Sequence, residues 1–266
     1  MLNFIKYICI WFAASATLIG SFANAGTMSD ANQTRENLFP SWYIGASAGG
    51  AWSKLENSLS ITSDPSNSYF VPKAISGVNA SGSASFDSDK FSGALQIGYE
   101  KFIKNNLFFG LELSYQYINL QKSTGGTFYY QTIELPYQLN NSASAKQMFA
   151  LRPRIGYLFD KFLPYITAGG ALTKLRFNQM FSEPPYTTLP VTAEYYKTKC
   201  GWTVGFGSEY ALFKNFYLKS EYLYTNFGSA TAFGYLQTPF GNANFNNSLG
   251  HLSVQTLLLG VNFHFA

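Results

Sequence analysis

The stretch that decides the predicted fold is Arg152–Ala171, RPRIGYLFDKFLPYITAGGA. Together with the three residues before it, it alternates two kinds of side chain with a period of two, as a β-strand with two different faces does. One face carries Phe149, Leu151, Ile155, Tyr157 and Phe159, and the other carries Ala150, Arg152, Arg154 and Gly156. An apolar face opposite a charged one is typical of a strand in a membrane barrel, where the outside meets lipid and the inside is polar.

This strand is the first half of a predicted hairpin, with a tight turn at residues 160–163 and a second extended run from Pro164. The second run, 164–177, has a blurred alternation, and its faces are not assigned. Similar segments occur on both sides of the hairpin, and each is predicted to be a strand. They span residues 42–52, 91–101, 109–117, 200–210, 216–227 and 256–265.

Between the predicted strands, long polar connections alternate strictly with short turns. The long connections span residues 55–88, 122–146, 179–196 and 228–249 and read as polar loops. Outer-membrane barrels have this asymmetry, with short turns in the periplasm and long loops outside. The sequence therefore predicts an all-β fold: a transmembrane, up-and-down antiparallel β-barrel of eight strands with four long external loops.

The amino-terminal residues have the three regions of a secretory signal peptide: Lys6 as the positive flank, an apolar run, and the small-residue site Ala23-Asn24-Ala25. We expect cleavage after Ala25, because the alternative, a retained anchor, would need a longer unbroken apolar run. The predicted organisation is a signal peptide at 1–25, a periplasmic leader at 26–40 and the barrel domain at 41–266. The predicted location is the cell outer membrane.

Composition narrows the function classes. Charged residues make up 12% of the chain and aromatic residues 18%, and the usual charged share in soluble domains is about 25%. The formal net charge of +4 is too small and too scattered for a nucleic-acid surface. The mature chain keeps one cysteine, Cys200, and its two histidines, His251 and His264, form no metal-ligand spacing, so neither a metal nor a cofactor is expected.

The inward faces of the predicted strands carry a nearly balanced set of charges. These residues are Glu100, Glu112, Arg152, Arg154, Glu209, Lys219 and Glu221. Because unpaired buried charges are heavily penalised, we expect the arginines to pair with glutamates of neighbouring strands, Glu112 first. The set is either a gate for permeation or an internal salt-bridge plug. An eight-stranded barrel is only wide enough for side chains to fill, which favours the plug. Glycines in the same rows, such as Gly98 and Gly207, are expected to leave room for the arginines.

The alternative architecture is a soluble β-sandwich or a lipocalin-like barrel, which would point its apolar residues inward. The charged inward set is hard to reconcile with such a core.

The hypothesis of a catalytic site rests on His251 and Ser253, whose spacing puts both side chains on one face of a strand. Nucleophilic catalysis needs a base with its own orienting group, and no acidic residue follows Ser253 in the chain. The face of Ser253 also carries Leu257, Leu259 and Val261. We therefore expect no enzyme activity, and read His251 as a polar residue at a strand mouth and His264 as a residue at the periplasmic edge.

Three segments resemble the opacity-type, OmpA-like outer-membrane β-barrel proteins: residues 152–171, residues 201–228 (GWTVGFGSEYALFKNFYLKSEYLYTNFG) and the ending LLLGVNFHF at 257–265. The resemblance implies an eight-stranded barrel of a Gram-negative outer membrane, inserted by the barrel-assembly machinery. It implies that Phe265 is the carboxy-terminal insertion signal, although here Ala266 follows it. Members of this family are surface antigens, adhesins or envelope-stabilising proteins, and some carry a further peptidoglycan-binding domain that we do not expect here.

The expected function is therefore non-enzymatic: a surface-exposed barrel that is envelope-structural or acts as an adhesin or surface antigen through its external loops. The expected partners are outer-membrane lipid or lipopolysaccharide, the barrel-assembly machinery and a host or extracellular ligand, but no nucleic acid. Two alternatives stay open, a lipid A-modifying deacylase-type barrel enzyme and a small narrow pore.

Overall fold

The structure is a computed structural model that describes residues 41–103, 106–130, 135–184 and 190–265. These residues belong to one compact unit, Pro40–Ala266. The predicted signal peptide with its cleavage site at Ala23 and Ala25, and the predicted leader at 26–40, lie outside the described residues.

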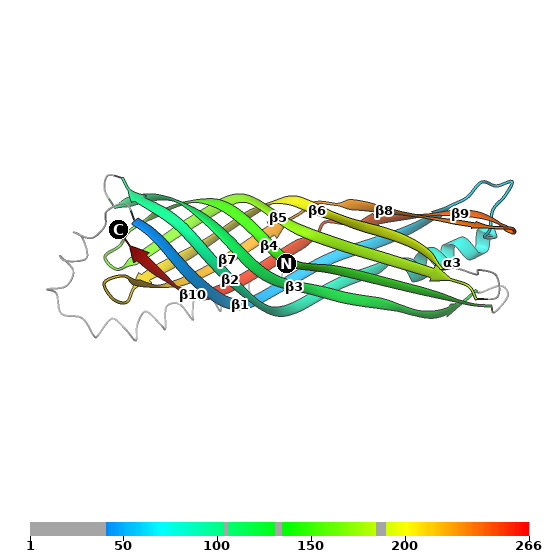
Figure 1. Ribbon diagram of the computed structural model, residues 1–266, viewed down its shortest axis with the longest axis horizontal. Helices are drawn as coiled ribbons and strands as arrows, with labels where there is room; N and C mark the ends of the chain where they lie inside the picture. The colour runs from blue at the N-terminus through cyan, green and yellow to red at the C-terminus, as the bar shows by residue number, and fades with distance from the viewer. Residues whose placement is uncertain (1–40, 104–105, 131–134, 185–189, 266) are drawn as a thin grey trace. The chain divides into compact units, whose positions relative to one another are not determined.

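The described chain is almost entirely β-structure (Figure 1). Its elements are β1 (Ser41–Thr62), α3 (Pro72–Gly82), β2 (Ala84–Phe102), β3 (Leu107–Tyr129), β4 (Pro136–Tyr157), β5 (Phe162–Ser182), β6 (Val191–Ala211), β7 (Phe216–Asn226), β8 (Ala230–Thr238), β9 (Gly241–Leu249) and β10 (Ser253–Phe265). In the part of the chain that the structure describes, no helix has the length and apolar character needed to cross a membrane.

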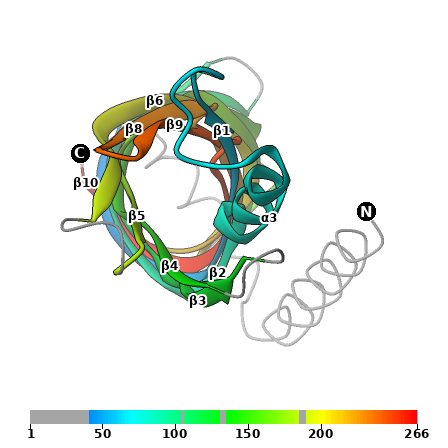
Figure 2. The same ribbon diagram turned by 90° about the vertical axis from the view of Figure 1, so that its right-hand side faces the viewer.

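Eight of the strands close a ring (Figure 2). Strands β1 to β6 each pair with the next strand, and β10 pairs with both β7 and β1, always antiparallel. The closing pair β1–β10 runs from Trp42 opposite Phe265 to Lys54 opposite Ser253. The predicted up-and-down barrel of eight strands is confirmed.

We call the half of the barrel that contains the start of β1 and the end of β10 the lower half, and the half that contains α3 the external half. In the lower half, apolar side chains point outward and polar ones inward. Leu95 and Ile166 are 62% and 63% exposed, whereas Gln96 and Thr167 are 5% exposed. The strand whose faces were not assigned follows the same rule, with Tyr165 and Thr167 inside. A soluble core would have the opposite arrangement, so the soluble alternative is wrong for this half.

The regions predicted as long external loops are mostly strands, so these loop limits are wrong. β3 and β4 stay paired up to Tyr129 opposite Pro136, and residues 228–249 contain the hairpin β8–β9. β9 pairs with residues 57–62 of β1, and β8 pairs with β6 through the single pair Glu194–Phe233. The barrel wall therefore continues beyond the apolar band toward the end where α3 lies (Figure 1).

The alternation of side chains inverts in this external half, which explains the error. On β4, Tyr137, Leu139 and Ala143 are buried inside while Gln138 and Asn140 are exposed. Pairing irregularities between Tyr117 and Leu120 on β3 and between Ser144 and Met148 on β4 separate the two halves. Each half follows the period of two, but the apolar side chains point outward in the lower half and inward in the external half. The polar outer face of the external half therefore has the composition of a loop.

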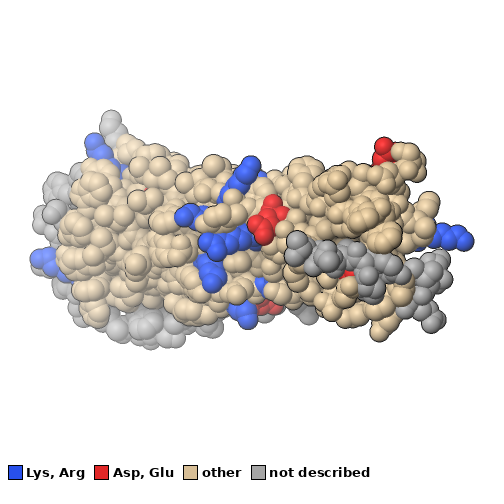
Figure 3. Space-filling view, turned by 45° about the vertical axis from the view of Figure 1, so that its right-hand side comes forward, with Lys and Arg blue, Asp and Glu red and all other residues tan. Residues whose placement is uncertain are grey.

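Strand length also separates the two halves. A strand of about 9–11 residues crosses a membrane, and β1 has 22 residues. On β2 the outward residues between Lys90 and Lys101 are apolar or glycine, and these ten positions match the crossing length. Figure 3 shows the corresponding surface, nearly free of charge on one side of a band of Lys and Arg side chains.

The interior of the external half is a packed apolar core in two clusters. The lower one includes Leu55, Phe86, Leu120, Phe177 and Phe227, and the upper one includes Phe70, Val78, Tyr137, Phe181 and Phe245. Between them lies a layer of buried amides made by Asn57, Asn141, Gln179 and Asn247.

Helix α3 docks on this amide layer. It begins with Pro72, which is favourable in the first helical turn, and contacts β1, β3 and β4 at the external mouth. The side-chain amides of Asn57, Asn141 and Gln179 all donate to the carbonyl oxygen of Gly82, at 3.1, 3.1 and 3.2 Å. β1 pairs with β2 only up to Asn57 opposite Ala84. Beyond this point the backbone amide of Ile61 on β1 donates to the Asn79 side chain of α3, which lies at the external mouth (Figure 2).

Candidate functional site: a buried charge cluster in the barrel

All seven charged residues predicted for the interior come together in one buried cluster. The register explains why: antiparallel pairing puts Glu112 opposite Arg152, Gly110 opposite Arg154, and Glu209 opposite Lys219. Each of the seven side chains is at most 2% exposed. We call these seven residues the interior cluster: Glu100, Glu112, Arg152, Arg154, Glu209, Lys219 and Glu221.

Glu112 is the most contacted acid of the interior cluster. The Arg152 Nη2 atom contacts Glu112 Oε1, the expected pair, and lies 3.1 Å from Glu221 Oε2. Lys219 Nζ lies 2.8 Å from Glu112 Oε2 and 3.3 Å from Glu221 Oε2. Three strands, β3, β4 and β7, are therefore joined across the lumen by two cations and two carboxylates.

Arg154 joins the remaining acids. Its Nη1 atom lies 3.0 Å from Glu100 Oε1 and 3.3 Å from Glu112 Oε2, and its Nη2 atom lies 2.5 Å from Glu209 Oε1. The planar guanidinium presents its donors in a rigid fork, so it can contact three carboxylates on different strands at once. Arg154 thus connects β2, β3 and β6 through β4.

Two tyrosines complete the cluster and were not among the predicted site residues. The Tyr43 hydroxyl accepts a hydrogen bond from Arg154 and donates one to Glu112 at 2.8 Å. The Tyr165 hydroxyl donates to Glu221 at 3.0 Å, and the Arg154 guanidinium lies 3.8 Å from the centre of the Tyr165 ring. The alternation places Tyr43 on the inward face, but Tyr165 lies in the strand with the blurred pattern.

The glycines of the inward rows make room for these rings. A methyl group added at Gly98 would overlap the Tyr43 ring, and one added at Gly207 would overlap the Tyr165 ring. The expectation that these glycines leave space for the arginines is therefore wrong: the tyrosines occupy it. The Arg154 guanidinium instead lies near both rings, 5.4 Å from the centre of the Tyr43 ring and 3.8 Å from that of the Tyr165 ring.

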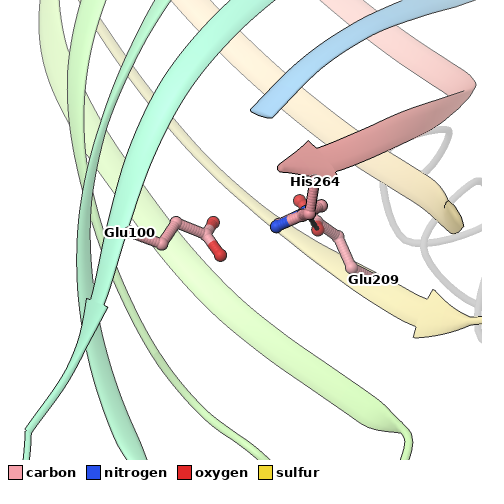
Figure 4. A group of neighbouring side chains, drawn as sticks. All are labelled: Glu100, Glu209 and His264. Atoms are coloured by element: carbon pink, nitrogen blue, oxygen red, sulfur yellow. Dashed lines mark ion pairs between the residues drawn. The ribbon is translucent and has the colours of Figure 1, made fainter. Parts of the chain in front are cut away.

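The group formed by Glu100, Glu209 and His264 has the donor atoms of a metal site, all within 4.8 Å of one another. Figure 4 shows the Glu100 carboxylate pointing across the lumen toward His264 and Glu209. His264 Nε2 lies 3.4 Å from Glu209 Oε2, and Asn262 donates to Glu209 at 2.9 Å. Arg154 binds both carboxylates, so a cation already fills the role that a metal would have here. His264 lies at the end of β10, near the lower mouth.

The other residues weighed from the sequence lie outside the interior cluster. His251 is exposed between β9 and β10, and Ser253 is half-buried on the outward side of β10, which it shares with Leu259. Cys200 carries a free, exposed thiol on β6. Phe265 is 38% exposed, points outward at the end of β10 and pairs with Trp42.

What the interior cluster can do follows from its geometry. It spans the lumen from five strands, and the two packed apolar clusters lie between it and the external mouth, so buried side chains occupy the interior at each of these levels. Removing one partner of a buried pair typically costs about 3–5 kcal/mol, because the other charge is left uncompensated. The arrangement is suited to hold strands in register and to close the lumen.

Comparison with known proteins defines the class. Residues 14–265 match the family described as "Outer membrane protein beta-barrel domain". The match covers nearly the whole chain, and the protein belongs to this family of outer-membrane β-barrels. It is located in the outer membrane, as predicted from its resemblance to opacity-type and OmpA-like barrels.

Individual relatives refine this picture. The 31 kDa outer-membrane immunogenic protein of Brucella melitensis biotype 1 is 30% identical over 189 residues, which cover 70% of each chain. The 25 kDa outer-membrane immunogenic protein of Brucella ovis is 32% identical over 80 residues, 30% of this chain and 34% of that protein.

Solved structures with a similar fold include two outer-membrane proteins. One is Ail of Yersinia pestis in complex with the heparin analogue sucrose octasulfate, at 13% identity and a TM-score of 0.35, covering 84% of this chain and 99% of that one. The other is the protease OmpT of Escherichia coli, at 11% identity and a TM-score of 0.45, covering 85% and 97%.

Proposed function

We propose that this protein is a non-enzymatic, closed outer-membrane barrel that presents its external half to the surroundings of the cell as an adhesin or surface antigen. The observation that carries the proposal is the filled interior. The interior cluster and the two apolar cores occupy the space that a channel or a buried active site would need. A closed barrel meets partners outside the cell through its external surface.

The chemistry of the external surface supports recognition of a partner. Large aromatic side chains stand exposed there, with Tyr129 62%, Phe233 68% and Tyr235 55% accessible. Exposed aromatic residues on a rigid scaffold are the residue type that most often dominates binding interfaces. The names of the Brucella relatives, outer-membrane immunogenic proteins, support exposure on the cell surface.

The test is a binding experiment with the refolded barrel in detergent micelles against host-cell surfaces, matrix proteins and acidic glycans. The variant Tyr129→Ser, Phe233→Ser, Tyr235→Ser removes the exposed aromatics. The matched control Gln138→Ser, Asn140→Ser, Thr192→Ser changes three exposed polar positions of the same external half. Saturable binding by the wild type and the control, and at least about tenfold weaker binding by the aromatic variant, is expected for an interface with aromatic anchors.

Absence of saturable binding to every member of the panel would remove the adhesin part of the proposal. The envelope-structural role would then be tested by deleting the gene and measuring detergent sensitivity. Lipid A whose acyl pattern changes with the gene would instead favour the deacylase alternative and contradict a non-enzymatic role.

We further propose that Phe265 acts as the insertion signal read by the barrel-assembly machinery. Its outward, exposed ring at the end of the closing strand is accessible to a partner before the barrel closes. Phe265→Ala is expected to lower the amount of folded barrel in the outer membrane, and the control Phe216→Ala, at an exposed aromatic on β7, is expected to lower it less. Equal levels for both variants would contradict this role.

A further inference from the structure

Basic side chains form a band around the barrel at the border between its apolar and its external half. Figure 3 shows this band on one face of the barrel. Its members, which are exposed or half-buried, are Lys54, Lys90, Lys122, Lys146, Lys174, Arg176, Lys197 and Lys199. Below it, the outward surface is apolar until the lysines near the lower turns, Lys101, Lys161 and Lys214.

Several of these basic side chains contact a carboxylate or a backbone oxygen of the barrel itself. Lys54 Nζ lies 2.8 Å from Glu56 Oε1. Lys122 donates to the backbone oxygen of Asp87 at 3.1 Å, and Lys199 donates to that of Ser229 at 2.5 Å.

The band is different on the outer face of β4 and β5. Among the residues that the structure describes, neither Lys146 nor Lys174 has an acidic group within 4.0 Å. The acid nearest in sequence register, Glu194, already accepts a hydrogen bond from Asn178 at 2.9 Å. Positive charge is therefore in excess on this face.

A groove of about 790 Å³ lies at this place. It forms where the β4–β5 pairing is irregular between Ser144 and Met148. Its lining includes Ser144, Lys146, Lys174, Arg176, Tyr196 and one carboxylate, that of Glu194, which the Asn178 amide already contacts. Such a volume falls in the range of ligand pockets, about 300–1,000 Å³. Three cations against one carboxylate, beside hydroxyl and amide groups, are suited to a ligand that carries both phosphates and sugar hydroxyls.

The groove holds its arginine in a defined position. The Arg176 guanidinium lies 4.4 Å from the centre of the Tyr196 ring and donates to the Tyr196 hydroxyl at 3.1 Å. This hydrogen bond and the charge of Arg176, followed by the charge of Lys174, lower the pKa of the exposed Tyr196 hydroxyl below its usual value. Both cations therefore act at the same point of the groove.

The groove also lies where a lipid head group would lie. Leu172 and Phe149, which pair across β5 and β4, are exposed directly below it, at 45% and 49%. Acyl chains against these apolar residues would leave the head group level with Lys146, Lys174 and Arg176, because apolar bands of outer-membrane barrels end at the head-group region.

From these observations we propose that the groove on the outer face of β4 and β5 binds the phosphorylated sugar head group of an outer-leaflet lipid. Lys146, Lys174 and Arg176 bind the phosphates, and Ser144 and Asn178 bind hydroxyl groups of the sugar. This adds a lipid-specific site to the barrel wall, independent of the proposed adhesin surface, which lies on Tyr129, Phe233 and Tyr235.

The test measures binding of lipid A by the purified full barrel in neutral detergent, using native mass spectrometry and titration. The variant Lys146→Gln, Lys174→Gln, Arg176→Gln removes the three cations. The matched control Lys101→Gln, Lys161→Gln, Lys214→Gln removes the same charge at the lower turns. We expect roughly tenfold or greater loss of affinity for the groove variant and less than about twofold for the control, because basic groups close to an anionic surface contribute strongly and distant ones are screened. The single variant Lys174→Gln, which leaves the Arg176–Tyr196 contact intact, serves if the triple variant does not fold, with an expected loss of roughly threefold.

Two further arms distinguish the source of the phosphate. Dephosphorylated lipid A is expected to bind the wild type at least about tenfold more weakly than phosphorylated lipid A, and excess inorganic phosphate is expected not to displace bound lipid A. Unchanged affinity of the groove variants, equal binding of the dephosphorylated lipid, or displacement of the lipid by inorganic phosphate would each overturn the proposal.

Discussion

At the scale of single residues, the interior cluster is held together by a few side chains that reach across the lumen. Arg154 alone contacts three carboxylates, Glu100, Glu112 and Glu209, and lies against the Tyr165 ring. In a site this buried, a charge is tolerated only because its partners are present. Substitutions in the interior cluster should therefore cost much more than substitutions of exposed charges.

The first prediction concerns Arg154→Ala. It leaves four buried glutamates with two cations, and the free energy of unfolding should fall by about 3–5 kcal/mol. Urea unfolding of the barrel in lipid vesicles measures it. The control Lys161→Ala changes a charge at the lower turn and should stay within about 0.5 kcal/mol. Equal stability of the two variants would show that the cluster does not hold the barrel together.

The second prediction concerns Gly98→Ala, whose new methyl group would overlap the Tyr43 ring. Overpacking of this kind costs about 1–3 kcal/mol. Gly170→Ala is the matched control, since a methyl group there meets no atom within 4 Å. The same unfolding assay compares them, and a neutral Gly98→Ala would mean that Tyr43 does not occupy the position described.

The residues of the interior cluster could be predicted from the sequence because a charged side chain on a strand that faces lipid has one favourable direction, inward. Arg152 and Arg154 follow from this alone. Their partners could not all be predicted, because contacts such as Tyr43 with Glu112 depend on the stagger between strands, which local alternation does not encode. Tyr165 was missed because Pro164 and Gly169-Gly170 blur the period of its strand.

At the scale of elements, α3 is attached to the barrel by an unusual concentration of hydrogen bonds on one carbonyl group. Asn57, Asn141 and Gln179, from β1, β4 and β5, all donate to Gly82. No apolar run in the sequence marks this helix, and residues 72–82 lie within the predicted loop 55–88, so the loop prediction is wrong here. The buried amides that receive it lie 25 to 97 positions away along the chain, beyond the reach of local pattern.

The third prediction follows from this attachment. Asn141→Ala removes one of the three donors, and local opening of α3 should become roughly fivefold more frequent, since a buried hydrogen bond contributes about 1 kcal/mol. Hydrogen exchange of residues 72–82 measures the opening. Asn140→Ala, at the neighbouring outward position, should leave exchange unchanged. Protection of α3 that is the same in both variants would contradict the docking described.

The two halves of the barrel also differ in which side of their strands carries the apolar residues. Strand existence in the lower half was predictable because apolar outward faces alternate with polar ones. In the external half both solvent and core are present, and alternation of Gln138, Leu139 and Asn140 has the same period with the opposite sign. The Ser- and Asn-rich composition of these segments is typical of loops, and it masks the period of two.

At the scale of the whole barrel, each half buries what the other exposes. The lower half is apolar outside and charged inside. The external half has a largely polar outer face, with some exposed aromatic residues, and buries Phe86, Phe177 and Phe245 inside. The predicted eight strands and the outer-membrane location are confirmed. Together the two interiors close the barrel.

Conductance in a planar lipid bilayer tests closure most directly. The wild-type barrel should give no discrete current steps, because the interior cluster and the apolar cores fill the lumen. Arg154→Ala, compared at equal amounts of inserted protein, should also stay closed, since the apolar cores lie above the substituted site. Stable steps from the wild type, changed in size by Arg154→Ala or Arg152→Ala, would show that ions pass through the cluster and would contradict the account.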